Sequence, residues 1–271
     1  MIKQAIIPLA GLGTRLLPLT SVFAKELLPI NGRPGIEYIL DECIEAGIKE
    51  IIFIISNKKL MIKKYFYSDK FYKNIIKKKK DPRIINDYKK ILKYRNKIKF
   101  VFQNIPKGTG DAALKSQKYI KNKYFLMLLP DDLIIKKNCS KAMIKVHKKY
   151  QASVMASMKV KKNNVSRWGI YKINKKLNIR DYIIDGVVEK PSIIKAPSNN
   201  AVIGRYILPR SIFKKIKSLK PGKGKEIHIT DAIQLLINDK EKFVAHNFEG
   251  KYLDCGTMSG YINSSKEIGK L

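Results

Sequence analysis

Cysteine and histidine are scarce in this chain, and their scarcity excludes two classes of protein. Among 271 residues there are three cysteines, Cys43, Cys139 and Cys255, and three histidines, all far apart. An odd number of widely spaced cysteines is neither a disulfide framework nor a zinc site, and it fits a reducing compartment. The histidines lack the spacing of metal ligands.

Long apolar runs are also missing. No stretch approaches the roughly 20 apolar residues that span a bilayer. The apolar N-terminal run is soon interrupted by Arg15, and no small-residue cleavage pattern follows it. Hydrophobic residues nevertheless make up 45% of the chain, which is enough to bury a substantial core. We therefore expect a soluble, cytoplasmic protein that does not contact membranes.

Acidic residues are few. The 22 Asp and Glu stand against 56 Lys and Arg, a formal net charge of +34. Such a balance is typical of nucleic-acid-binding proteins. However, lysine is abundant together with isoleucine and asparagine, as AT-rich codon usage would produce, and runs such as Lys77–Lys80 are usually solvated. We therefore expect the charge to attract anionic substrates and not to bind nucleic acid.

The residues that are present predict alternating strands and helices. Apolar runs predict strands, and periodic patterns predict helices. In the first half the strands are 3–9, 51–55, 99–103 and 124–129, and the helices are 34–47 and 109–120. The segment 57–97, rich in Lys and Tyr, is predicted to be a helical excursion over the surface.

The second half has shorter predicted elements. The strands are 153–160, 169–173, 187–188 and 201–208, and the helices are 211–216 and 230–237. No linker or repeat divides the chain. We predict a single α/β domain over residues 1–271: a Rossmann-like, mostly parallel sheet flanked by helices, with a smaller β-rich elaboration in the second half.

Polar residues follow three of the predicted strands. Gly11, Gln103 and Asp131 each lie at or just beyond the carboxyl end of a strand. In sheets of this kind, ligands bind at that edge. We therefore expect the three residues to lie around one site.

The most informative segment is the glycine loop AGLGTR at 10–15. Two glycines allow backbone N–H groups to approach an anion, and Arg15 adds a planar fork for phosphate oxygens. Lys25 adds a mobile point charge. A dinucleotide fingerprint needs glycine where Leu16 stands, and a Walker loop needs Gly-Lys-Ser/Thr. An ordinary tight turn is the alternative for the glycines alone, whereas the combination with both cations predicts a triphosphate cradle.

Together with later segments, this loop resembles the sugar-1-phosphate nucleotidyltransferases. The shared motifs run in order along nearly the whole chain: AGLGTRLLP at 10–18, KELLP at 25–29, Gln103, KGTG at 107–110, LPD at 129–131, WG at 168–169, VEKP at 188–191, VIGRY at 202–206, EIHITD at 226–231 and DCG at 254–256. Leucine between the two glycines favours the uridylyl branch, since thymidylyl relatives usually carry a double glycine there.

The resemblance implies a reaction. A uridylyl group would pass from UTP to α-D-glucose 1-phosphate by direct in-line attack assisted by Mg²⁺, giving UDP-glucose and pyrophosphate. It also suggests a homo-oligomer, a dimer or tetramer. A thymidylyltransferase, another sugar-1-phosphate nucleotidyltransferase, a basic nucleic-acid-binding module and an inactive regulatory relative remain alternatives.

The resemblance also assigns residues. Arg15 would contact the leaving pyrophosphate, Lys25 would neutralise the α-phosphate region, and both would act with Asp131 in catalysis. Residues 1–150 would mainly bind the nucleotide, through Ala10, Gly11, Gly13, Thr14, Glu26, Gln103 and Gly108. Residues 151–271 would mainly bind the sugar phosphate, through Gly169, Glu189 and Lys190.

Two carboxylates, Asp131 and Asp254, resemble the Mg²⁺ ligands of the family. Mg²⁺ prefers a few carboxylate oxygens together with substrate phosphates and water. A carboxylate after an apolar strand is costly unless it caps a helix or binds a cation. A helix N-cap for Asp131, a plain turn for Asp254 and a competing role for Asp132 stay open. Lys225 and His228 depart from the family pattern, either at a subunit contact or near the sugar.

Overall fold

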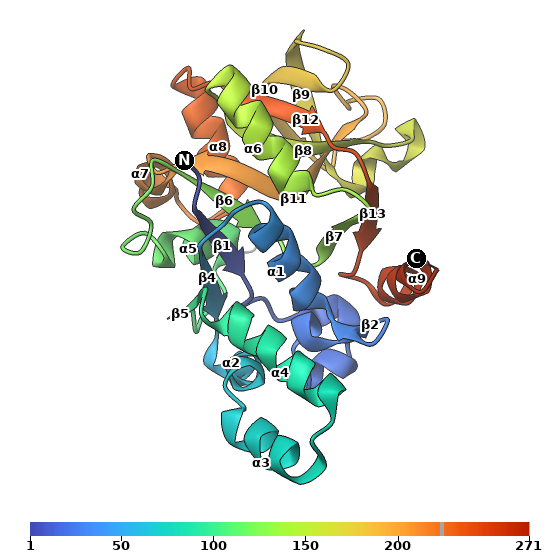
Figure 1. Cartoon of the computed structure of the whole chain (residues 1–271). Coiled ribbons are helices and arrows are strands. Elements are labelled where there is room, and N and C mark those ends of the chain that lie inside the picture. Colours follow the sequence, from blue (N-terminus) through green and yellow to red (C-terminus); the bar gives the residue numbers. More distant parts are fainter. Residues whose placement is uncertain (223–224, 271) are drawn as a thin grey trace.

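A nine-stranded sheet forms the centre of the protein, in the order β5-β4-β1-β6-β11-β8-β12-β10-β9 (Figure 1). The computed structural model describes residues 1–222 and 225–270. The strands of this sheet are β1 (Gln4–Pro8), β4 (Glu50–Ile55), β5 (Ile98–Phe102), β6 (Tyr124–Leu128), β8 (Ser153–Lys159), β9 (Gly169–Lys176), β10 (Asp181–Glu189), β11 (Asn200–Pro209) and β12 (Phe243–Asn247). Two small ribbons pair β2 (Pro29–Ile30) with β3 (Arg33–Pro34), and β7 (Asp132–Ile135) with β13 (Lys251–Asp254).

The α/β class is confirmed, but the sheet is mixed, and the expectation of a mostly parallel sheet holds only for its first half. Strands β5, β4, β1 and β6 are parallel to one another. Strand β11 then runs antiparallel to both of its main neighbours, β6 and β8, and β9 and β10 form an antiparallel pair. A short connection between neighbouring strands permits only antiparallel pairing, whereas a parallel pair needs a long crossover.

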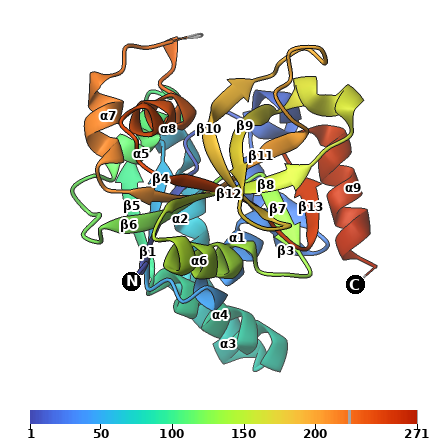
Figure 2. The same ribbon diagram turned by 90° about the horizontal axis from the view of Figure 1, so that it is seen from above.

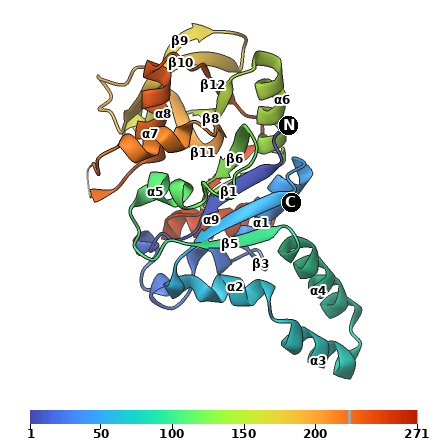
Figure 3. The same ribbon diagram turned by 90° about the vertical axis from the view of Figure 1, so that its left-hand side faces the viewer.

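Helices cover both faces of the sheet. They are α1 (Gly35–Glu45), α2 (Leu60–Phe66), α3 (Asp69–Lys79), α4 (Pro82–Arg95), α5 (Gly108–Lys115), α6 (Cys139–Tyr150), α7 (Ile212–Ser218), α8 (Ile229–Asn238) and α9 (Met258–Ile268). Helices α5, α7 and α8 lie on one side of the sheet, and α1 and α6 lie on the other (Figure 3). In the described part of the chain no helix is both long and apolar enough to cross a bilayer.

Strand β4 shows why its all-apolar run is needed. Ile51, Phe53 and Ile55 pack into the core on the α1 side, and Ile52 and Ile54 pack into the core on the α5 and α8 side. Successive side chains of a strand point to opposite faces. A strand covered on both faces is therefore apolar at every position.

The predicted helical excursion over 57–97 is confirmed. It consists of a 3₁₀ turn followed by α2, α3 and α4, and α3 has no buried residue. The α3–α4 hairpin projects from the body of the molecule (Figures 1 and 2). The helix predicted over 109–120 ends at Lys115, where Ser116 Oγ donates to the carbonyl of Ala113 at 2.6 Å. Such side-chain bonds compete with helical ones.

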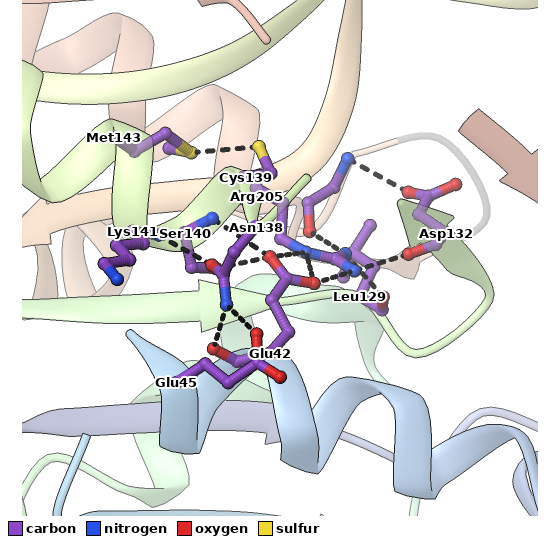
Figure 4. Close-up of polar contacts among 11 residues, drawn as sticks. Glu42, Glu45, Leu129, Asp132, Asn138, Cys139, Ser140, Lys141, Met143 and Arg205 are labelled. Carbon is purple, nitrogen blue, oxygen red and sulfur yellow. Dashed lines mark hydrogen bonds and ion pairs between the residues drawn. The ribbon is translucent and has the colours of Figure 1, made fainter. Parts of the chain in front are cut away.

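A buried ion pair joins three elements of the fold. Arg205 of β11 has no exposed surface, and its Nε lies 3.1 Å from each carboxylate oxygen of Glu42 in α1. Its Nη2 lies 2.9 Å from Glu42 Oε2, and the hydroxyl of Ser140 in α6 donates to Oε1 (Figure 4). Hydrogen bonds to several groups are what make such a buried pair tolerable.

Breaking this pair on one side is expected to be costly. Glu42→Gln leaves the Arg205 guanidinium buried without its counter-charge, which should lower the free energy of unfolding by about 3–5 kcal/mol. Denaturant titration monitored by circular dichroism measures this. The double variant Glu42→Leu/Arg205→Met should lose less than the single variant. A loss below 1 kcal/mol in Glu42→Gln, or a larger loss in the double variant, contradicts this account.

Candidate active site

The glycine loop follows β1 and lies at the carboxyl edge of the parallel strands. Gly13 has φ of 71° and is the N-cap of the 3₁₀ turn Thr14–Leu16. Its carbonyl accepts a hydrogen bond from Thr20 Oγ1 at 2.8 Å. This left-handed conformation favours glycine. At Gly11, by contrast, a Cβ would meet no atom within 4 Å, so the backbone there borders open space.

Two cations meet on one oxygen of Asp131. Lys25 Nζ lies 2.8 Å from Asp131 Oδ2, and Arg15 Nη2 lies 3.3 Å from the same atom. Burial lowers the pKa of Lys25, but the carboxylates of Asp131 and Glu26 together outweigh this and raise the pKa overall. Burial likewise raises the pKa of Asp131, and the charge of Lys25 reverses the shift, so that its pKa falls below the usual value. Both shifts favour the charged forms of Lys25 and Asp131 at neutral pH.

The backbone around Asp131 is fixed by Arg205. The guanidinium donates from Nη1 to the carbonyl of Leu129 at 3.0 Å and from Nη2 to the carbonyl of Asp132 at 2.5 Å (Figure 4). Between these points, the amide of Cys255 donates to the carbonyl of Asp131 at 2.8 Å. Asp131 is followed by strand β7 and not by a helix, so a helix N-cap does not explain its carboxylate.

Asp254 reaches the same place from β13. A Cβ on Gly256 would lie 2.9 Å from Asp131 Oδ2, 3.1 Å from Asp254 Oδ1 and 2.7 Å from Arg15 Nη2. The two carboxylates and the Arg15 guanidinium therefore converge beside a glycine, where a side chain would collide with all three. Asp254 Oδ1 also accepts a hydrogen bond from the amide of Gly256 at 2.8 Å, which is the contact that a carboxylate makes in a plain turn.

Asp132 has a different environment. Its Oδ2 accepts from the amide of Gly204 at 3.0 Å, and its Oδ1 accepts from the hydroxyl of Tyr252 at 2.6 Å. Burial and the nearby charge of Asp131 raise the pKa of Asp132 to about 6. Both of its oxygens are engaged by the protein, so it is a poor competitor for the role of Asp131.

The donor set over Gly256 fits Mg²⁺. Among residues 1–222 and 225–270, no group of three or more His, Cys, Asp or Glu side chains is suited to hold a metal ion. Two neighbouring carboxylates, such as Asp131 and Asp254, match the donors that Mg²⁺ uses, since it takes its remaining ligands from substrate phosphates and water.

Three adjoining hollows surround Leu129, which lines all of them. The lining of the first includes seven of the predicted site residues, and we call it the nucleotide cleft after that prediction: Ala10, Gly11, Lys25, Glu26, Gln103, Gly108 and Asp131. The second contains Arg15, Asp131, Lys190 and Asp254. The third contains Glu189, Lys190 and His228. Gly13, Thr14 and Gly169 line none of the three, and the first two form the start of the 3₁₀ turn that closes the glycine loop.

The predicted sugar-side residues lie on the β9–β10 pair. Gly169 and Glu189 are cross-strand partners, and a Cβ on Gly169 would lie 3.0 Å from Glu189 Oε2. His228, one of the departures from the family pattern, lies 3.9 Å through Nε2 from Glu226 Oε2. His228 lines the third hollow together with Glu189 and Lys190. Lys225 has a left-handed backbone with φ of 58°.

Two residues that were expected to bind the nucleotide, Gly108 and Glu26, also have a role in packing or ion pairing within the protein. At Gly108, a Cβ would lie 2.5 Å from the carbonyl oxygen of Ile227, so glycine is needed there for chain packing as well as for any ligand. The carboxylate of Glu26 is bound by Lys59, whose Nζ lies 2.8 Å from each of its oxygens. Burial lowers the pKa of Lys59 despite this partner.

Sequence reasoning did not single out Lys59, Arg205 or Tyr252. Lys59 is one lysine in a segment full of lysines and is conspicuous only because it is buried. Arg205 lies within the VIGRY motif, where a cation inside an apolar strand was an available signal. The hydroxyl of Tyr252 carried no such signal.

Comparison with known proteins supplies the family. Residues 4–270 match the model described as nucleotidyl transferase. The chain belongs to this family. A putative UTP–glucose-1-phosphate uridylyltransferase of Methanocaldococcus jannaschii is 36% identical over 269 residues, which cover 99% of this chain and 94% of the relative. A UTP–glucose-1-phosphate uridylyltransferase of Streptococcus pyogenes is 36% identical, covering 97% of this chain and 88% of the relative.

Solved structures agree with this assignment. A UDP-glucose pyrophosphorylase complexed with UDP-glucose superposes on this nucleotidyltransferase with a TM-score of 0.87 and 36% identity, covering 100% of this chain and 99% of that one. A UTP-bound enzyme of Acinetobacter baumannii gives a TM-score of 0.90 at 32% identity, covering 99% and 94%. The family resemblance is therefore confirmed along the whole chain.

Gly256 provides a test of the convergence of Asp131, Asp254 and Arg15. Gly256→Ala places a methyl group among these three side chains and should reduce nucleotidyl transfer, measured as pyrophosphate release, by about a hundredfold or more. Gly269→Ala is the matched control, because its Cβ would meet no atom closer than 3.4 Å. Activity near that of the unmodified protein in Gly256→Ala would show that the space over this glycine is not used.

Proposed function

We propose that the protein transfers the uridylyl group of UTP to α-D-glucose 1-phosphate, releasing pyrophosphate and forming UDP-glucose. The main support is the meeting of Arg15, Lys25 and Asp131 at one edge of the cleft that Gln103 and Gly108 line. The full-length similarity to UDP-glucose pyrophosphorylases gives the substrates.

The chemistry needs alignment and charge neutralisation. The sugar phosphate oxygen is already anionic, so it attacks the α-phosphorus of UTP without a general base. The bond from that phosphorus to the β-phosphate oxygen breaks, and pyrophosphate leaves. In this proposal Lys25 neutralises charge at the α-phosphate, and Arg15 stabilises the departing oxygens.

The remaining residues hold the two substrates. Ala10, Gly11, Gly13 and Thr14 form the loop for the phosphates, Gln103 and Gly108 read the uracil, and Glu26 supports Lys25 from the adjacent position. Gly169, Glu189 and Lys190 bind the sugar phosphate. Residues 1–150 thus serve mainly the nucleotide, and residues 151–271 serve mainly the sugar.

The metal expected here is Mg²⁺, held by Asp131 and Asp254. When bound, it neutralises phosphate oxygens whose charge grows during transfer. We further infer a cytoplasmic enzyme that forms a dimer or tetramer, as the family resemblance suggests.

The direct test mixes the protein with UTP, α-D-glucose 1-phosphate and Mg²⁺ and measures pyrophosphate and UDP-glucose. Both products should form in equal amounts, and EDTA should abolish the reaction. Arg15→Ala and Lys25→Ala should each lower the rate by about 10²–10³-fold because each removes one charge-stabilising donor. Equal turnover with dTTP, or no turnover with any nucleotide, would overturn the assignment.

A further inference from the structure

The side-chain amide of Gln103 is held in one orientation. Its Nε2 donates to Asp111 Oδ2 at 2.6 Å and lies 3.4 Å from the carbonyl oxygen of Gly108. A carboxylate and a carbonyl only accept hydrogen bonds, so the nitrogen of the amide must occupy this side. In the described part of the chain, the opposite atom, Oε1, has no donor.

Asp111 lies outside the lining of the nucleotide cleft and contacts it through Gln103. Gln103 lines the nucleotide cleft, whereas Asp111, in the first turn of α5, does not. Both residues are buried, with exposed fractions of 4% and 8%. Lys115 Nζ lies 3.7 Å from the second oxygen, Asp111 Oδ1. Asp111 therefore has no contact with the cleft and one strong contact with the residue that faces it.

We propose that Asp111 is a specificity-determining positioning residue, which fixes the Gln103 amide so that the site accepts uracil and rejects cytosine. The proposal rests on the proposed function, because it concerns the base of the nucleotide substrate.

The two pyrimidines differ in the hydrogen bonds that they offer. Uracil presents a donor at N3 between two carbonyl acceptors. Cytosine presents an acceptor at N3 beside an amino donor. With Nε2 held by Asp111, Oε1 of Gln103 is free to accept from N3–H of uracil. Cytosine requires the amide to rotate by half a turn, which breaks the bond to Asp111 and brings Oε1 against a carboxylate oxygen.

The test compares UTP with one nucleotide that has a different hydrogen-bonding edge, CTP, and with one that has the same edge, 5-methyl-UTP. The specificity constant kcat/KM is measured for UTP, CTP and 5-methyl-UTP with α-D-glucose 1-phosphate, in the unmodified protein, in Asp111→Asn and in Lys115→Met. The Asn side chain has the shape of Asp but can present either an oxygen or an NH₂ group, so Gln103 is held equally well in both orientations.

In Asp111→Asn, the preference for UTP over CTP should fall by about ten- to a hundredfold, the range for a hydrogen bond to a charged group. The ratio of UTP to 5-methyl-UTP should stay within about twofold, because the methylated base has the same hydrogen-bonding edge. Lys115→Met is the matched control on the outer side of Asp111 and should leave both ratios unchanged.

Two results would overturn the proposal: an unchanged UTP-to-CTP ratio in Asp111→Asn, or an equal change in the 5-methyl-UTP ratio, which indicates a merely loosened pocket.

If Asp111→Asn does not fold, Asp111→Ser carries the same expectation, since a hydroxyl also donates and accepts. Dissociation constants for UTP and CTP, measured by calorimetry, decide the question without turnover. Absence of transfer by the unmodified protein would therefore contradict the proposed function and still leave the base preference measurable.

Discussion

The candidate active site depends on the guanidinium of Arg205, although this group lies outside the site. Arg205 is fully buried, and its hydrogen bonds to the carbonyls of Leu129 and Asp132 fix the backbone on both sides of Asp131. Glu42 balances its charge from α1. Because α1 follows the segment of Lys25 after the short β2–β3 ribbon, one buried pair relates the loop of Asp131 to the segment that carries Lys25. Rigid support of this kind is what holds a charge-stabilising site in a productive geometry.

A second buried pair supports the other side of the cleft. Lys59 binds both oxygens of Glu26, the neighbour of Lys25. Lys25 in turn contacts Asp131. Opposite charges thus alternate along the chain of contacts Lys59, Glu26, Lys25 and Asp131. Each member is buried or half-buried and has a counter-charge nearby, as buried charges require.

The sequence predicted the parallel half of the sheet well, because its inner strands are covered on both faces and are apolar at nearly every position. The sequence did not predict the direction of the strands or the contacts between distant side chains. Apolar runs do not distinguish parallel from antiparallel pairing, and the ribbon of β7 and β13 was not predicted because Asp132 interrupts the apolar pattern. At the site, motif residues such as Gln103 and Asp131 could be identified. Lys59 and Asp111 could not, since their importance lies in which distant side chain they contact.

Helix α3 has a consequence for how this sequence can vary. It contains no buried residue and carries the run Lys77–Lys79 at its end. A segment that buries nothing imposes few requirements on its side chains beyond forming a helix. Genomic drift toward particular codons can therefore accumulate lysine in α3 at little cost, whereas the same drift is opposed along β4 by packing on both faces. The contrast between the lysine-rich α3 and the apolar β4 then follows from how much of each element folding buries.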